Sequence, residues 1–258
     1  MTDREIQDSL IRALADAPFR STPGWREQRL ADPSRLERFA RFLARHYYYE
    51  RLIHFFKYSR VLARITGRSP ETVLTGAGFD GLLEVLVLGS RASAIAVATL
   101  AVDHVRAGDG ARDQVPYLED LTAYEHAMMV VESGARVWSD GSGAEATRNQ
   151  WSVPIRAEGT MLLDFTYDLP VVLPLLLKPW TELPQAPRRP TRLLIARSPH
   201  GRVSVARTST AIDMLLQLAD GRKSLDDLAR DAGLRPAELQ ATLEGLVEIG
   251  AVRFSLGS

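Results

Sequence analysis

The first half of the chain is dominated by apolar residues at helical spacing. From Ser34 onward they recur three and four positions apart until Gly67, which predicts a helix ~50 Å long if it is unbroken. Asp32-Pro33 has the form of a helix start, and the three consecutive tyrosines 47–49 are a place where the helix could break. Further helices are expected from Ser69-Pro70-Glu71 and over Leu82–Leu88, Ala92–Val105 and Tyr117–Val131.

The pattern changes in the second half from helical to mixed. Thr160–Tyr167 is a candidate strand, and the proline-rich stretch Leu183–Pro190 is expected to run extended. Thr191–Arg197 and Arg202–Arg207 predict a hairpin around the turn 198–201. Helices over Ser209–Ala219, Leu225–Ala232 and Pro236–Ile249 and a final strand at Val252–Ser255 complete the prediction.

These patterns predict an α+β protein with two domains. Residues 1–135 would form an all-α helical domain, and residues 150–258 a winged-helix-like α+β domain with a small antiparallel sheet. The small, polar stretch Ser139–Asn149 lies between them and is expected to be a boundary or an exposed loop.

Composition excludes several classes of protein. The 258 residues hold 32 basic and 32 acidic side chains, so no overall charge attracts nucleic acid or an anionic membrane. The absence of cysteine excludes disulfides, thiolate metal sites and a cysteine nucleophile. We also find no secretory signal and no long uninterrupted apolar run. We therefore expect a soluble, cytoplasmic protein.

Charge is nevertheless unevenly distributed along the chain. Residues 26–64 carry ten Lys or Arg against four acids, and residues 188–207 carry six arginines and no acid. Such segregation is typical both of surfaces that meet a charged partner and of ordinary solvated helix faces.

No motif supplies a self-sufficient active site. His46, Glu50 and His54 lie four positions apart and could hold a divalent metal, but neighbouring aromatic residues favour a packing surface. Residues 76–81 match G-x-G-x-x-G without the preceding buried strand that dinucleotide binding requires, which favours a loop. We predict no catalytic residue and no metal ligand in this chain, and this favours a binding role.

The winged-helix-like unit is compatible with two kinds of partner. A DNA reader needs basic residues on its second helix, whereas 236–249 contains three glutamates and no Lys or Arg. A peptide-binding domain instead adds an extended peptide to an exposed strand. The third possibility is that the hairpin only packs the domain together. The candidate peptide-binding residues are Arg202, Val203, Ser204, Val205 and Arg207 on the strand, with Leu239 and Leu243 beside it. Flanking arginines suit an acidic peptide.

Two segments resemble known families. One segment resembles the recognition element of ribosomal-peptide biosynthesis, a small domain typified by the pyrroloquinoline-quinone peptide chaperone. The segment is LLIARSPHGRVSVARTSTAIDMLLQLADGRKSLDDLARDAGL, and it includes Asp220-Gly221-Arg222-Lys223-Ser224. The aromatic- and arginine-rich segment Arg41–Arg64 and the stretch 116–125 look like the helical domain of partner subunits of multinuclear non-haem iron oxidative enzymes. Such pairs modify cysteine of a precursor peptide on the way to methanobactin and 3-thiaglutamate.

The resemblance implies a non-catalytic partner subunit. A TIM-barrel enzyme would hold the iron, so no cofactor is expected in this chain. The expected partners are that enzyme and the leader of a precursor peptide, with no nucleic acid and no membrane. The alternatives are a winged-helix transcription regulator that binds DNA, and an enzyme that uses His46, Glu50 and His54.

Overall fold

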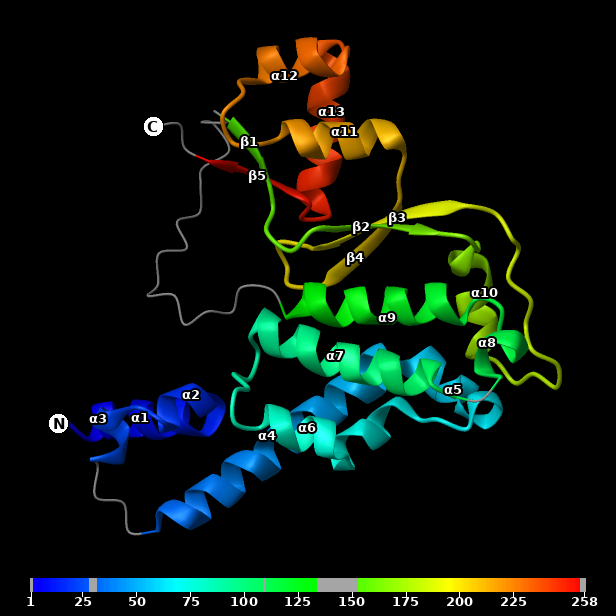
Figure 1. Cartoon of the computed structure of the whole chain (residues 1–258). Coiled ribbons are helices and arrows are strands. Elements are labelled where there is room, and N and C mark those ends of the chain that lie inside the picture. The colour runs from blue at the N-terminus through cyan, green and yellow to red at the C-terminus, as the bar shows by residue number, and fades with distance from the viewer. Residues whose placement is uncertain (1, 28–31, 109, 134–152, 256–258) are drawn as a thin grey trace. The chain divides into compact units, whose positions relative to one another are not determined.

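A computed structural model describes residues 2–27, 32–108, 110–133 and 153–255 (Figure 1). A mostly helical region over residues 3–132 is followed by an α+β region with small antiparallel sheets, which confirms the predicted fold class. The contacts divide the chain into two compact units. Unit 1 comprises Met1–Met129 and Val172–Pro184, and unit 2 comprises Val130–Val171 and Gln185–Ser258. The expected boundary at 139–149 lies outside the described residues.

Local signals set the helix ends of the helical region. Thr2 forms a capping box with Glu5, and the Asp32 side chain accepts the backbone N–H of Arg35 at 2.9 Å. The helices are α1 (Asp3–Ala15), α2 (Ala17–Arg20), α3 (Pro23–Arg26), α4 (Pro33–Phe55), α5 (Lys57–Thr66), α6 (Ala77–Leu82), α7 (Arg91–Arg106), α8 (Ala111–Gln114) and α9 (Leu118–Glu132), with a 3₁₀ helix η1 (Pro70–Thr75).

The helical region corrects three details of the sequence prediction. The long helix breaks at Phe56 and not at the tyrosines, because Tyr48 lies on the buried face of α4 and continues it. A short helix occupies residues 77–82, whereas the helix expected over Leu82–Leu88 is irregular apart from one isolated bridge. Residues 3–26, for which no element was predicted, contain α1, α2 and α3.

One apolar core holds α4, α6 and α7 together in unit 1. Tyr48 packs edge-on against Phe79, with ring centroids 6.2 Å apart. Small residues of α7 let the helices approach closely. The core comprises Ala44, Tyr48, Leu52, Phe55, Phe56, Leu74, Phe79, Leu83, Leu86, Ala94, Val97, Ala98, Ala101, Val102 and Met129.

The α+β region contains two small antiparallel sheets. Its elements are β1 (Val153–Arg156), β2 (Met161–Phe165), α10 (Leu169–Leu176), β3 (Thr191–Arg197), β4 (Val203–Arg207), α11 (Thr210–Leu218), α12 (Leu225–Ala232), α13 (Pro236–Glu248) and β5 (Val252–Ser255). β1 pairs with β5, and the other sheet has the order β2-β3-β4. The hairpin, the three helices and the last strand were all expected, whereas β1 and α10 were not.

The three C-terminal helices pack on one face of the β2-β3-β4 sheet. Leu194 and Ala196 of β3 share an apolar cluster with Leu215, Leu228 and Leu246. A tight turn after α13 closes this core: a Cβ on Gly250 would lie 1.9 Å from the carbonyl oxygen of Arg197, and Gly250 has a φ of +82°. Only glycine fits there.

The Asp-Gly step of the family-like motif has a structural role. Gly221 has a φ of +80° and donates its N–H to the Pro154 carbonyl of β1 at 3.1 Å. The Asp220 carboxylate accepts the Arg222 N–H at 2.8 Å, which closes the turn. This step therefore joins α11 to the β1-β5 sheet.

None of the helices in the described residues is both long and apolar enough to cross a bilayer.

Candidate peptide-binding edge

Strand β4 lies at the edge of its sheet. It pairs only with β3 among the described strands, with Leu194 opposite Ala206 and Ala196 opposite Ser204. Figure 1 shows β4 leading directly into the connection to α11. An edge strand presents backbone donors and acceptors that a further strand can pair with.

Two hydrogen bonds just outside β4 show which of its residues point their backbone N–H and C=O groups away from β3. The Ser198 N–H donates to the Arg202 carbonyl at 2.8 Å, and the Thr208 N–H donates to the Arg192 carbonyl at 3.0 Å. Residues 202 and 208 therefore point their backbone groups at β3. Because these groups alternate along a strand, 204 and 206 also point at β3, whereas 203, 205 and 207 point away from it.

The outward backbone groups of β4 have no partner in the part of the chain that the structure describes. The strand thus offers the N–H and C=O groups of Val203, Val205 and Arg207 to an added chain. These are three of the residues that the sequence singled out. The ladder that a foreign strand needs is present over the whole length of β4.

The two faces of β4 differ in side-chain size. Ser204 and Ala206 share a face with Leu194 and Ala196, the face covered by the C-terminal helices. Both are small and half-buried. Val205 lies on the other face and is 38% exposed. Ala206 was not among the predicted site residues, although the alternation of side chains along the strand places it on the same face of β4 as Ser204.

One end of the edge carries two arginines on a single buried carboxylate. Asp168 has no exposed side-chain surface and accepts hydrogen bonds from Arg207, at 2.5 Å, and from Arg189. Burial by itself would raise the pKa of Asp168, but the hydrogen bonds and charges of the two arginines outweigh it and lower that pKa. The side chain of Arg207 is 48% exposed and that of Arg189 is 65% exposed. Together with Asp168 they leave one net positive charge beside β4.

The other end of the edge carries Arg202. Its backbone N–H donates to the Ser198 hydroxyl at 3.2 Å, and its side chain forms no ion pair within the described residues. By contrast, Arg192 is paired with Asp164 at 2.6 Å and Asp213 at 3.2 Å. The arginine-rich segment is therefore partly neutralised, and positive charge remains at the two ends of β4.

The structure does not bring Leu239 and Leu243 to this edge. Each is 1% exposed and belongs to the apolar core under the sheet. In this conformation a peptide beside β4 cannot contact them. The sequence pattern identified them correctly as apolar positions on one helix face, but that face packs inward.

The other candidate motifs form no site. His46 stacks on Phe42, and His54 lies edge-on against Phe55 with centroids 4.7 Å apart. Within the residues described, no group of three His, Asp or Glu side chains could hold a metal. Residues 77–81 of the glycine-rich segment lie in α6, so the expected loop is wrong. A 3₁₀ helix precedes this segment in place of the strand that a dinucleotide site requires.

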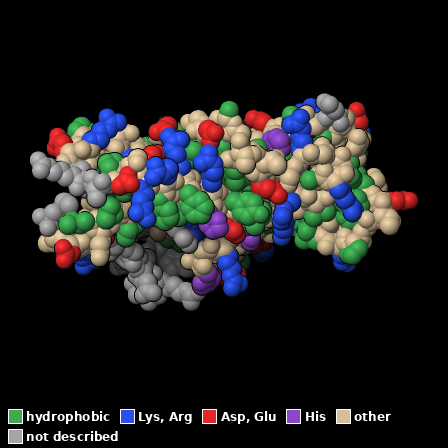
Figure 2. All heavy atoms as spheres, turned by 90° about the horizontal axis from the view of Figure 1, so that it is seen from below, with side chains coloured by type: hydrophobic (Ala, Val, Ile, Leu, Met, Phe, Trp, Pro, Cys, Tyr) green, Lys and Arg blue, Asp and Glu red, His purple; other side chains and the backbone are tan. Residues whose placement is uncertain are grey.

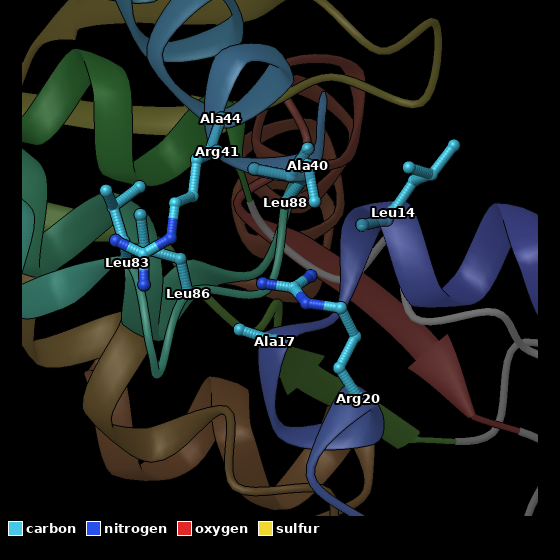
Figure 3. A pocket seen from close by; sticks show the side chains of 10 residues that line it. Leu14, Ala17, Arg20, Ala40, Arg41, Ala44, Leu83, Leu86 and Leu88 are labelled. Carbon is cyan, nitrogen blue, oxygen red and sulfur yellow. The ribbon is translucent and has the colours of Figure 1, made fainter. Parts of the chain in front are cut away.

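A small cavity in unit 1 is lined by side chains that already contact one another (Figure 3). Its volume is about 10 Å³, room for roughly one water molecule. The two arginines in its lining are already paired: Arg20 with Glu37 at 2.8 Å, and Arg41 with Glu37 at 3.0 Å. This cavity is too small for an organic ligand.

No protein-family model matches the sequence, and no curated protein matches it significantly.

Proposed function

We propose that this chain is a non-catalytic, cytoplasmic partner protein that binds the leader of a ribosomally made precursor peptide. The leader adds to β4 as a fourth strand of the β2-β3-β4 sheet. The observation that carries this proposal is the unpaired ladder of Val203, Val205 and Arg207. Strand addition draws its affinity from backbone hydrogen bonds, and flanking side chains set its specificity.

The arginines at the two ends of β4 favour an acidic leader. Arg202 and the Arg207–Arg189 pair leave positive charge at both ends of the strand. Exposed charges of this kind steer association and select a partner more than they add affinity.

The resemblance of the helical segment adds the second partner. The helical domain docks on a TIM-barrel multinuclear iron enzyme, which holds the metal and performs the oxidation. This chain then raises the effective concentration of the precursor's cysteine at that enzyme. Copurification with such an enzyme tests this part of the proposal.

A DNA-binding role is less well supported. α13, in the position of a recognition helix, carries three glutamates and no basic residue. Phosphates would be repelled along this helix.

The direct test measures the affinity of a fluorescently labelled leader peptide for Val205→Pro. Proline removes an outward donor while leaving the bonds to β3 intact, so we expect the affinity to fall by about tenfold or more. Val203→Pro should behave in the same way. Val205→Ala is the matched control, because it keeps the N–H; its affinity should stay within about threefold of the wild type. Unchanged affinity in both folded proline variants would exclude strand addition.

A further inference from the structure

The two arginines on Asp168 have hydrogen-bond donors left for a further anion. Each guanidinium uses one nitrogen, Nη2, on the Asp168 carboxylate, and the Nε and Nη1 atoms of both have no partner within the described residues. A guanidinium carries five N–H donors, so most of them stay unused. Arg189 and Arg207, the arginine pair, therefore present free donors next to each other at the surface.

Asp168 holds both guanidiniums in place. Its side chain is fully buried directly before α10, whereas Arg189 precedes β3 and Arg207 ends β4. A long side chain that is already fixed loses less conformational freedom when it binds a ligand. The arginine pair is thus prepared for a carboxylate, the anion that a guanidinium binds through two parallel hydrogen bonds.

Arginines of the helical region differ in this respect. In unit 1, Arg41 pairs with Glu84 and Arg45 pairs with Asp80. Figure 2, which views the side where α4 lies at the bottom of Figure 1, shows Asp and Glu side chains next to Lys and Arg. These basic groups have acids of their own, whereas at the end of β4 two cations share one carboxylate.

The position of Arg207 on β4 relates the arginine pair to an added strand. Side chains alternate along a strand, so Arg207 shares a face of the sheet with Val203 and Val205. The backbone groups of the same three residues point outward. A leader residue opposite Arg207 therefore places its side chain on this face, with the two Cβ atoms ~5 Å apart. An aspartate or glutamate at that place reaches the arginine pair.

Arg202 marks the other end of the strand on the opposite face. It lies five positions before Arg207, and because five is an odd number its side chain points to the face of Ser204 and Ala206. All strand pairs described in unit 2 are antiparallel. In an antiparallel leader, the residue opposite Val205 follows the residue opposite Arg207 by two positions, and the residue opposite Arg202 follows it by five.

We propose that the arginine pair binds one carboxylate side chain of the leader and thereby sets the register of the added strand. This inference rests on the proposed function. From its N-terminal end, the leader segment consists of an acid, any residue, an apolar residue, any two residues and a second acid. The first acid meets the arginine pair, the apolar residue covers Val205, and the second acid meets Arg202. A shift by one residue turns all three side chains to the wrong face of the sheet.

The first experiment measures by fluorescence anisotropy how labelled synthetic peptides of equal composition bind to the full chain. The matched peptide has the central run glutamate, threonine, valine, threonine, threonine, glutamate between flanking threonines and serines. A shifted peptide exchanges the first glutamate with the threonine that follows it. We expect the matched peptide to bind about tenfold more tightly. Equal affinities, or no binding by either peptide, overturn the register.

A third peptide tests the direction of the added strand. It exchanges the valine with the threonine that follows it, which gives the spacing that a parallel strand would need. Antiparallel pairing predicts that this peptide binds more weakly than the matched peptide. Tighter binding by the third peptide would contradict the antiparallel register.

Arg189→Gln tests the arginine pair itself. It should weaken the matched peptide by about threefold or more, and changing the first glutamate of that peptide to glutamine should then have no further effect. Arg188→Gln is the matched control, because Arg188 is exposed, forms no ion pair within the described residues and carries the same charge one position away. Its affinity should be unchanged, and equal losses in the two folded variants would exclude a specific role of the pair.

The inference and the proposed function fail in different ways. If Val205→Pro abolishes binding of peptides that the wild type binds equally well, strand addition stands and the register is wrong. If Arg189→Gln weakens the matched peptide and Val205→Pro does not, the arginine pair binds carboxylates without an added strand, which overturns the proposed function.

Discussion

Among the described residues, each unit buries one carboxylate, and the partners of the two carboxylates differ. In unit 1, Glu125 of α9 is fully buried and accepts the backbone N–H groups of Tyr58 and Ser59 at 2.8 and 3.1 Å. In unit 2, Asp168 is equally buried and holds Arg189 and Arg207. The first carboxylate meets the start of a helix, and the second meets two cations.

The pKa values follow from this difference. Burial raises the pKa of Glu125 to about 8, because helix N–H groups and the Ser59 hydroxyl offset only part of the lost hydration. Two guanidiniums lower the pKa of Asp168 despite its burial. The carboxyl is thus mostly protonated at neutral pH in unit 1 and stays charged in unit 2. The groups that contact the buried carboxylate therefore decide whether its pKa is raised or lowered.

The largest effect is expected at Glu125. Glu125→Ala leaves two buried N–H groups of the first turn of α5 without an acceptor, so the free energy of unfolding should fall by about 3 kcal/mol. Glu125→Gln keeps an acceptor and should cost less. Urea unfolding followed by circular dichroism measures both, and equal losses would contradict the capping role.

The same comparison predicts a pH dependence. Since the folded-state pKa of Glu125 is raised, its contribution to stability is complete below about 4.5, the ordinary value, and is lost as the pH rises toward about 8. Glu125→Gln removes this titration. The stability difference between variant and wild type should therefore move in favour of the variant across this window, and a constant difference would refute the assignment.

An intermediate effect is expected at Asp168. Asp168→Asn weakens the hold on two arginines and should lower the free energy of unfolding by about 2 kcal/mol at neutral pH. Because the folded-state pKa is lowered, this loss should shrink as the pH falls below about 3.8. Asp164→Asn is the matched control: Asp164 is 70% exposed, so its pair with Arg192 should be worth less than about 1 kcal/mol. Equal costs for the two variants would show that burial of Asp168 is irrelevant.

The smallest effect is expected at Ser59. Its hydroxyl donates to Glu125 and lowers the pKa of that carboxyl, so Ser59→Ala should raise the pKa further. The loss of stability should be about 1 kcal/mol. Carbon-detected NMR titration of the Glu125 carboxyl measures the shift, and a downward shift would contradict the hydrogen bond.

Sequence reasoning was most accurate where the signals are local. α12 was predicted with its observed bounds, because Ser224 caps its start and Gly233, with a φ of +66°, ends it. The hairpin of β3 and β4 was also predicted, since a continuous apolar run in β3 and an alternating pattern in β4 flank a turn that holds Pro199 and Gly201. Such features depend on a few neighbouring residues.

Sequence reasoning failed where contacts between distant residues determine the structure. Leu239 and Leu243 have the same apolar periodicity whether they line a groove or a core, and only the packing of α13 buries them. The break at Phe56 was missed because the residue that receives the next N–H groups, Glu125, lies more than sixty positions away. No local pattern reports either contact.

By itself, the sequence determined the three C-terminal helices, the hairpin and the positive charge near residues 202–207, because caps, turns and periodicity act over one or two turns of chain. Only the tertiary structure decided that β4 lies at the edge of its sheet, that Val203 and Val205 point their backbone groups outward, and that Asp168 gathers two arginines there. These depend on strand order and burial, which join segments that are far apart in the chain.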